Sequence, residues 1–316
     1  MGDLRSVARA PLGRGPSHER MELETSGQCT PARVKIGSMA VEARQGSSGQ
    51  AVARAPRHAA RSRGADSVSQ RVMRVTVLGS GDAFGAGGRF HSAYLTEVDG
   101  ATFLLDCGPS ILQAAKLVPW DLAKLDAVLI THLHGDHFGG VPFLFMEYLY
   151  ETPRTRPLVI YGPEGTERRV KCLFTALYER SAAEPLPFPV VYHELEAGQT
   201  IALGAASITA VLVHHVPELT AFGYRVEVGG RTLLYSGDTA WTDELAEHAR
   251  GVDLFVCECS TFETQLDIHV SYPEIAARAR ELGCRRIVLS HLGNELLRRL
   301  DELSLECARD GMTLDL

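Results

Sequence analysis

The chain has 316 residues, of which 45% are hydrophobic, and a formal net charge of −7. This length allows one large domain with a full core, or one domain with an appendage. No stretch reaches the roughly 18 consecutive apolar residues of a membrane helix, which excludes a membrane protein and leads us to expect a soluble, cytoplasmic one. The seven cysteines form an odd, scattered set, which favours reduced thiols over a disulfide framework.

The composition of the chain changes near residue 71. Residues 1–72 carry 12 Lys and Arg against 6 Asp and Glu, a net of +6, whereas the remainder has a net of −13. Residues 1–71 are rich in Arg, Ala, Gly and Ser, so we predict a disordered basic extension, with the chemistry downstream of it. A targeting peptide, or a true start of translation at Met73, are the alternatives. Residues 72–316 form the predicted folded domain.

Strand and helix patterns alternate through the first half of this domain. Alternating β-branched residues predict a first strand, and the glycine-rich segment 79–88 after it predicts a loop. Asp99-Gly100 is typical of a hairpin turn between the next two strands. The predicted strands are 74–78, 92–98, 101–106, 126–130 and 157–161, and the predicted helices are 109–117, 138–150 and 165–180.

The second half repeats this mixture of strands and helices. Gly229-Gly230 predicts another hairpin turn. The predicted strands are 190–193, 206–213, 222–228, 231–235, 253–257 and 286–289, and the predicted helices are 241–248 and 272–282. Two strand-rich halves, each followed by helices, predict an α/β fold in the form of a four-layer αββα sandwich.

Four potential metal ligands lie within six residues, directly after the predicted strand 126–130. They are His132, His134, Asp136 and His137, in the segment THLHGDHFGG. The glycines of this segment let its backbone fold tightly around a small object. Burying three histidines and an aspartate this densely would be costly without a cation. The segment therefore predicts a metal site.

Further ligand candidates follow other predicted strands. His214 comes after 206–213, Asp238 after 231–235 and His291 after 286–289. Two metal ions about 3.5–4 Å apart can be bridged by a carboxylate, such as that of Asp238, and by a water or hydroxide. The sequence therefore predicts a centre with two divalent metal ions and a shared hydroxide that attacks the substrate.

These residues, in this order, resemble the metallo-β-lactamase superfamily over roughly residues 73–316. The resemblance implies the αββα sandwich and a hydrolase with two bound cations, zinc being expected and manganese or iron the alternatives. Asp106, in LLDCG, matches the aspartate that orients the histidine segment. The implied ligands are His132, His134 and His214 for the first ion, Asp136, His137 and His291 for the second, and Asp238 between the two.

Further motifs resemble the branches that contain ribonuclease Z, glyoxalase II and small phosphodiesterases. SGDT surrounds Asp238, LSHL surrounds His291, and FGYR spans 222–225. His269, 22 residues before His291, matches a histidine that assists the leaving group. The resemblance implies catalytic roles for His269 and for Asp136, which would both ligate and accept a proton from the nucleophile.

One departure from ribonuclease Z bears on the substrate. That enzyme usually carries a tRNA-binding arm between the third histidine motif and the bridging aspartate, but only 23 residues separate His214 from Asp238 here. The charge of −13 also disfavours a polyanion as partner. We therefore predict a phosphodiesterase, without the arm, that acts on a small phosphodiester or nucleotide-like substrate through a metal-bridged hydroxide. The alternatives are a tRNA 3′ endonuclease, a thioester or lactone hydrolase, and a non-enzymatic metal-binding protein; a homodimer is common among the relatives.

Three smaller assignments also follow from the sequence. His214 and His215 compete for one ligand position, and the H-x-V-P pattern of 214–217 favours His214. Cys257 and Cys259 are spaced like metal ligands, but their position in an apolar strand predicts a buried strand face. His91 has two equal interpretations, as a residue lining the pocket or as one on a hairpin rim.

Overall fold

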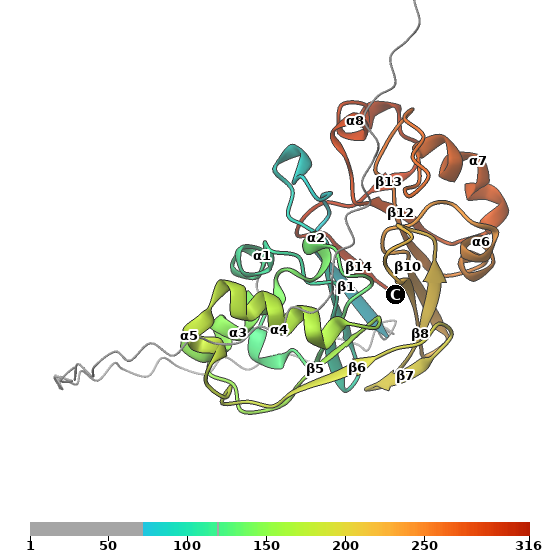
Figure 1. Ribbon diagram of the computed structural model, residues 1–316. Helices are drawn as coiled ribbons and strands as arrows, with labels where there is room; N and C mark the ends of the chain where they lie inside the picture. The colour runs from blue at the N-terminus through green and yellow to red at the C-terminus, as the bar shows by residue number, and fades with distance from the viewer. Residues whose placement is uncertain (1–71, 119) are drawn as a thin grey trace, which may run out of the picture. The chain divides into compact units, whose positions relative to one another are not determined.

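The computed structural model describes residues 72–118 and 120–316 (Figure 1). The predicted basic extension, 1–71, lies outside the described residues. Within the described residues, no helix has both the length and the apolar character needed to span a membrane.

The first sheet has seven strands in the order β14-β1-β2-β3-β4-β5-β6. Strands β14 to β3 pair antiparallel, and strands β3 to β6 pair parallel. The parallel half matters for function because the carboxyl ends of its strands meet at one edge. The strands are β1 (Met73–Gly79), β2 (Ala93–Val98), β3 (Ala101–Leu105), β4 (Ala127–Leu129), β5 (Leu158–Gly162), β6 (Val190–Glu194) and β14 (Thr313–Asp315).

The second sheet also has seven strands, in the order β13-β12-β11-β10-β9-β8-β7. Strands β7 to β10 form an antiparallel meander, and β10 to β13 pair parallel. The strands are β7 (Thr200–Leu203), β8 (Ala206–Val213), β9 (Ala221–Val228), β10 (Arg231–Tyr235), β11 (Leu254–Glu258), β12 (Ile287–Ser290) and β13 (Glu306–Cys307).

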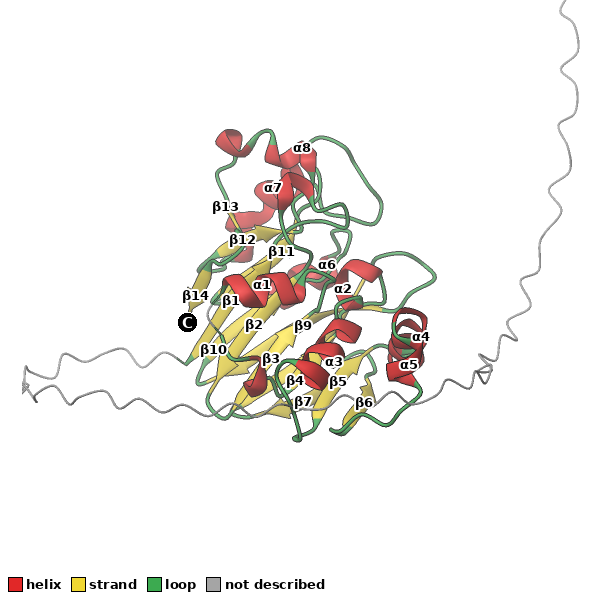
Figure 2. Cartoon of the chain, turned by 90° about the vertical axis from the view of Figure 1, so that its left-hand side faces the viewer, coloured by secondary structure: helices red, strands yellow, loops and turns green. Residues whose placement is uncertain are grey.

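Helices cover the outer face of each sheet, as Figure 2 shows for the first. Local sequence sets their ends: α7 begins with a reciprocal capping box between Ser271 and Glu274, and it stops at Gly283, which takes the left-handed conformation. The helices are α1 (Ile111–Leu117), α2 (Gly135–Phe138), α3 (Val141–Tyr150), α4 (Thr166–Leu177), α5 (Glu179–Ala182), α6 (Asp243–Ala249), α7 (Tyr272–Leu282) and α8 (Asn294–Leu297), with short 3-10 turns η1 (Ala86–Gly88), η2 (Leu122–Lys124) and η3 (Leu300–Glu302).

Three apolar clusters hold these layers together. The largest lies between the sheets and combines side chains such as Phe103 of β3 with Tyr224 of β9. A second joins the first sheet to α1, α3 and α4, and a third joins the second sheet to α6, α7 and α8. The layers therefore run helix, sheet, sheet, helix, and the predicted αββα sandwich is confirmed.

The predicted helix 138–150 differs from the structure at its start. The chain forms α2, turns at Gly139-Gly140, and then forms α3. A Cβ at Gly140 would collide with the carbonyl oxygen of Gly108, so glycine permits the close approach that breaks the helix. The short strands β7, β13 and β14 were not predicted.

Candidate metal centre

The predicted histidine segment follows the carboxyl end of β4 and leads into α2. His132 is fully buried, and its Nε2 lies 3.1 Å from Nδ1 of the half-buried His134. Asp136 and His137 lie in the single turn of α2. The segment therefore presents two pairs of side chains, one before the helix and one within it.

The first pair is completed by His215, just beyond β8. Its Nε2 lies 3.1 Å from Nδ1 of His134, and its Nδ1 lies 3.0 Å from the carbonyl oxygen of Ile268, to which it donates. Imidazole nitrogens that bind one tetrahedral zinc at about 2.0–2.1 Å are about 3.3 Å apart. The spacing of His132, His134 and His215 fits such an ion.

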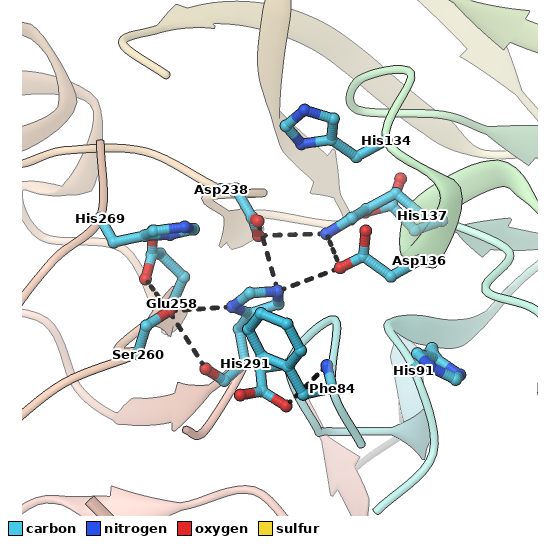
Figure 3. Close-up of polar contacts among 12 residues, drawn as sticks. Phe84, His91, His134, Asp136, His137, Asp238, Glu258, Ser260, His269 and His291 are labelled. Carbon is cyan, nitrogen blue, oxygen red and sulfur yellow. Dashed lines mark hydrogen bonds and ion pairs between the residues drawn. The ribbon is translucent and has the colours of Figure 1, made fainter. Parts of the chain in front are cut away.

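The second group is Asp136, His137, Asp238 and His291 (Figure 3). Nε2 of His137 lies 3.3 Å from Oδ2 of Asp136 and 3.2 Å from Oδ1 of Asp238. Nε2 of His291 lies 3.3 Å from Oδ2 of each aspartate. Oδ2 of Asp238 is also 4.0 Å from Nε2 of His132, so this carboxylate adjoins both groups.

Two buried atoms at this centre need a partner. Nε2 of His137 and Oδ1 of Asp238 form no hydrogen bond within the described residues, although they face each other. Buried polar atoms in native proteins are nearly always hydrogen-bonded or bound to an ion. A divalent cation would satisfy both, so the residues present fit metal binding.

The charges at the centre also fit a cation. Burial lowers the pKa of His132, His134 and His215, so these imidazoles are neutral and able to act as ligands. Burial opposes ionisation of Asp238, but the neighbouring His137 and His291 hold the pKa of its carboxyl well below its usual range. The first group thus offers three neutral imidazoles. In the second group, burial opposes protonation of His137 and His291, but the neighbouring aspartates raise the pKa of both, so a cation there would displace protons from these nitrogens.

Comparison with known proteins identifies the family. Residues 101–292 match the beta-lactamase superfamily domain. The chain belongs to this superfamily. A ribonuclease Z of Mycobacterium bovis is 30% identical over 240 residues, which cover 70% of this chain and 86% of that one.

Solved structures agree with this assignment of the superfamily fold. The metallo-β-lactamase fold protein YhfI of Bacillus subtilis has a TM-score of 0.64 at 24% identity, covering 78% of this chain and all of that one. A diphosphatase of the PhnP family has a TM-score of 0.61 at 22% identity, covering 77% and 98%. The predicted ribonuclease Z-like branch of the metallo-β-lactamase superfamily is confirmed, and the protein is a metal-dependent hydrolase that acts on ester bonds.

The superfamily centre rests on a buried network around Asp106. Its carboxylate lies 2.7 Å from Nδ1 of His137, accepts from the amide of Thr131 at 2.8 Å and from that residue's hydroxyl, and accepts from the hydroxyl of Tyr235 at 2.7 Å. By bonding Nδ1, the carboxylate turns Nε2 of His137 towards Asp238. Asp106 therefore orients the histidine segment, as the resemblance implied.

The preference for His214 over His215 was wrong. His214 is exposed, whereas His215 is buried beside His134. The alternation of β8 continues past its last residue, so His215 points inward like Val213, and His214 points to solvent. The alternation of inward and outward residues along the strand indicated His215, but the H-x-V-P pattern led to the preference for His214.

His269 lies at the edge of both ligand groups. Its ring stacks on His291 with centroids 5.5 Å apart, and its Nδ1 lies 2.7 Å from Oε1 of Glu258. Burial alone would lower the pKa of His269, but the Glu258 carboxylate raises it to about 9. With Nδ1 held by Glu258, Nε2 is the ring nitrogen that does not contact this carboxylate.

Two residues that support the centre were not predicted from the sequence. Glu258, at the end of β11, is buried and accepts from the amide of Thr239 at 2.9 Å as well as contacting His269. Arg169 of α4 donates from Nη1 to the carbonyl oxygen of Leu133, at 2.8 Å, and so ties down the histidine segment. Glu258 could have been noticed as a charged residue directly after the apolar run 254–257. No feature of the neighbouring sequence indicates a role for Arg169.

The remaining assignments concern residues around the centre. Cys257 lies in β11 and Cys259 follows directly after it, and both side chains are buried, as expected for the inward face of a strand. His91 is half-buried, with its Nδ1 3.2 Å from the hydroxyl of Ser110.

Proposed function

We propose that this hydrolase cleaves a small phosphodiester or nucleotide-like substrate. The observation that carries the proposal is the arrangement of His269 at the edge of two ligand groups that adjoin through Asp238. This geometry supplies places for a nucleophile, a phosphoryl group and a proton donor within one site.

Two divalent cations are the group this site would hold. His132, His134 and His215 would bind one, and Asp136, His137 and His291 the other, with Asp238 shared; zinc suits the nitrogen-rich set, and manganese or iron are the alternatives. When bound, such a pair lowers the pKa of water and stabilises charge on phosphoryl oxygens.

Side chains of the protein accept and donate the protons of the reaction. A carboxylate oxygen of Asp136 accepts a proton from the attacking water, and Nε2 of His269 donates one to the departing oxygen. Glu258 holds the imidazole by Nδ1 and keeps it protonated, since its charge raises the pKa of His269 to about 9. Glu258 therefore favours the protonated imidazole that a proton donor requires.

The short connection between His215 and Asp238 supports the proposal of a small substrate. Strands β9 and β10, joined at Gly229-Gly230, account for most of it, and no extended arm emerges from this part of the described chain. The net charge of −13 for residues 73–316 also disfavours a polyanionic partner.

Cleavage of tRNA precursors at the 3′ side is the second candidate. It is favoured by relatives named ribonuclease Z, whose matched length reaches 86–90% of their own chains. Incubation with a precursor tRNA separates the candidates, because a small-substrate enzyme would leave the tRNA intact.

The decisive experiment measures hydrolysis of bis(p-nitrophenyl) phosphate by protein of known metal content. We expect turnover in the wild type and normal turnover in the control His214→Ala. On an alkyl phosphodiester, whose alkoxide leaving group needs a proton, His269→Ala should lower turnover about 10²–10⁴-fold, because general acid catalysis is lost. A thioester and lactone panel runs in parallel. Hydrolysis of acyl esters without phosphodiesters would overturn the proposal, as would full activity of His269→Ala on the alkyl phosphodiester.

The homodimer is a separate proposal, and light scattering during size-exclusion chromatography tests it.

A further inference from the structure

The loop after β1 carries an unusually exposed aromatic ring. Phe84 is 88% exposed, more than any other large hydrophobic side chain in the described part of the chain. Exposure at this level leaves both faces of the ring accessible. Transfer of an exposed phenyl ring from water into contact with another apolar surface is favourable.

This loop lies against the metal centre. Gly81 pairs with Leu292, the residue directly after His291, and the amide of Leu292 donates to the carbonyl oxygen of Ser80 at 3.1 Å. Figure 3 shows Phe84 in front of His291 in the close-up of the centre. Phe84 is therefore three residues along the chain from Gly81, which contacts the segment that follows β12 and supplies His291.

The loop is also held in shape before any ligand binds. Oδ1 of Asp82 accepts from the amides of Phe84 and Ala86, at 3.1 and 3.0 Å. At its base, the amide of Gly81 donates to the carbonyl oxygen of Phe90 at 2.8 Å. A preformed loop loses little conformational entropy on binding, so contact with its aromatic ring contributes more fully to affinity.

We infer that Phe84 forms a subsite for a planar aromatic ring, the nucleobase of a nucleotide ester whose phosphodiester lies at the metal centre. The inference rests on the proposed function and narrows its substrate class. A single ring beside a phosphate-cleaving centre suits a base, because a stacked base needs one flat apolar face within reach of its own phosphate. Stacking does not depend on base identity, so the subsite accepts several bases.

The test compares two methyl phosphodiesters that differ only in the base, the methyl esters of adenosine 5′-phosphate and of ribose 5-phosphate, followed by ³¹P NMR. We expect Phe84→Ala to lower kcat/KM for the adenosine ester about tenfold, through KM, and to leave the ribose ester unchanged. Phe84→Trp should retain activity on both. Tyr150→Ala, which removes another exposed aromatic ring at the far end of α3, is the matched control.

The outcomes separate this subsite from the proposed function. Equal effects of Phe84→Ala on both esters, or none on either, would overturn the subsite. If wild-type protein cleaves neither ester, hydrolysis of bis(p-nitrophenyl) phosphate decides on the proposed function, and calorimetry of metal-loaded protein with adenosine 5′-phosphate and ribose 5-phosphate decides on the subsite alone. Weaker binding of only the adenosine compound to Phe84→Ala supports it, and unchanged binding of both refutes it.

Discussion

Replacement of Asp106 tests whether the metal centre depends on a buried hydrogen-bond network. Asp106→Ala leaves donors of Thr131, His137 and Tyr235 without their acceptor in a fully buried site. Removing one partner of a buried charged network costs about 3–5 kcal/mol. Alanine in the left-handed conformation of this residue, at φ 59°, adds about 1–2 kcal/mol. We expect the free energy of unfolding to fall by about 5 kcal/mol.

Asp106→Asn separates the two contributions. Asparagine tolerates the left-handed conformation and keeps one acceptor oxygen, so its loss should be about half as large. Urea denaturation, run on metal-free and on fully loaded protein, measures both variants, because bound metal adds stability of its own. Asp301→Ala, an exposed control, should stay within about 0.5 kcal/mol of wild type. Losses below about 1 kcal/mol in both Asp106 variants would refute the network.

Three further predictions concern neighbouring histidines, arginines and one carboxylate. His215→Ala should lose about one metal ion per chain by elemental analysis, whereas His214→Ala should lose none. Arg169→Met should weaken metal affinity about 10–100-fold in a chelator competition, and Arg168→Met should not. Burial opposes ionisation of Asp253, but a backbone amide and two arginines hold the pKa of its carboxyl below the usual range. The ionised carboxyl of Asp253 therefore stabilises the fold above pH 4, and this stabilisation is lost as the pH falls. Asp253→Asn should make the free energy of unfolding depend less on pH at the acid end, as measured by urea titrations at pH 3–7.

The sequence predicted much of the fold because local signals coincide with the tertiary structure. Strand 206–213, strand 231–235 and helix 272–282 match β8, β10 and α7 to the residue. Their ends are marked by glycine turns or by a capping box, which act locally. The short strands β13 and β14 carry too few residues for a period to show, and their pairing partners supply the order.

The candidate site was predictable where one segment carries several ligands. His132 and His137 are recognisable because four potential ligands lie within six residues. Glu258 and Arg169 contact the site only through residues elsewhere in the sequence. Glu258 contacts His269 across a loop, and the apolar residues before it predict only a buried strand. Such supporting contacts depend on the packing of separate elements, which no single window of sequence contains.

Two strained residues link the centre to the packing of both sheets. Asp106, after β3, and His291, after β12, are the non-glycine residues with positive φ in the described chain, at 59° and 55°. Each such conformation costs about 1–3 kcal/mol, and hydrogen bonds offset the cost, including that between Nδ1 of His291 and the hydroxyl of Ser260 at 2.9 Å. Because the first sheet supplies Asp136 and the second supplies His291, these proposed ligands meet only when the sandwich is closed. A metal bound by both would therefore stabilise the packing of the two sheets, and that packing would in turn favour metal binding.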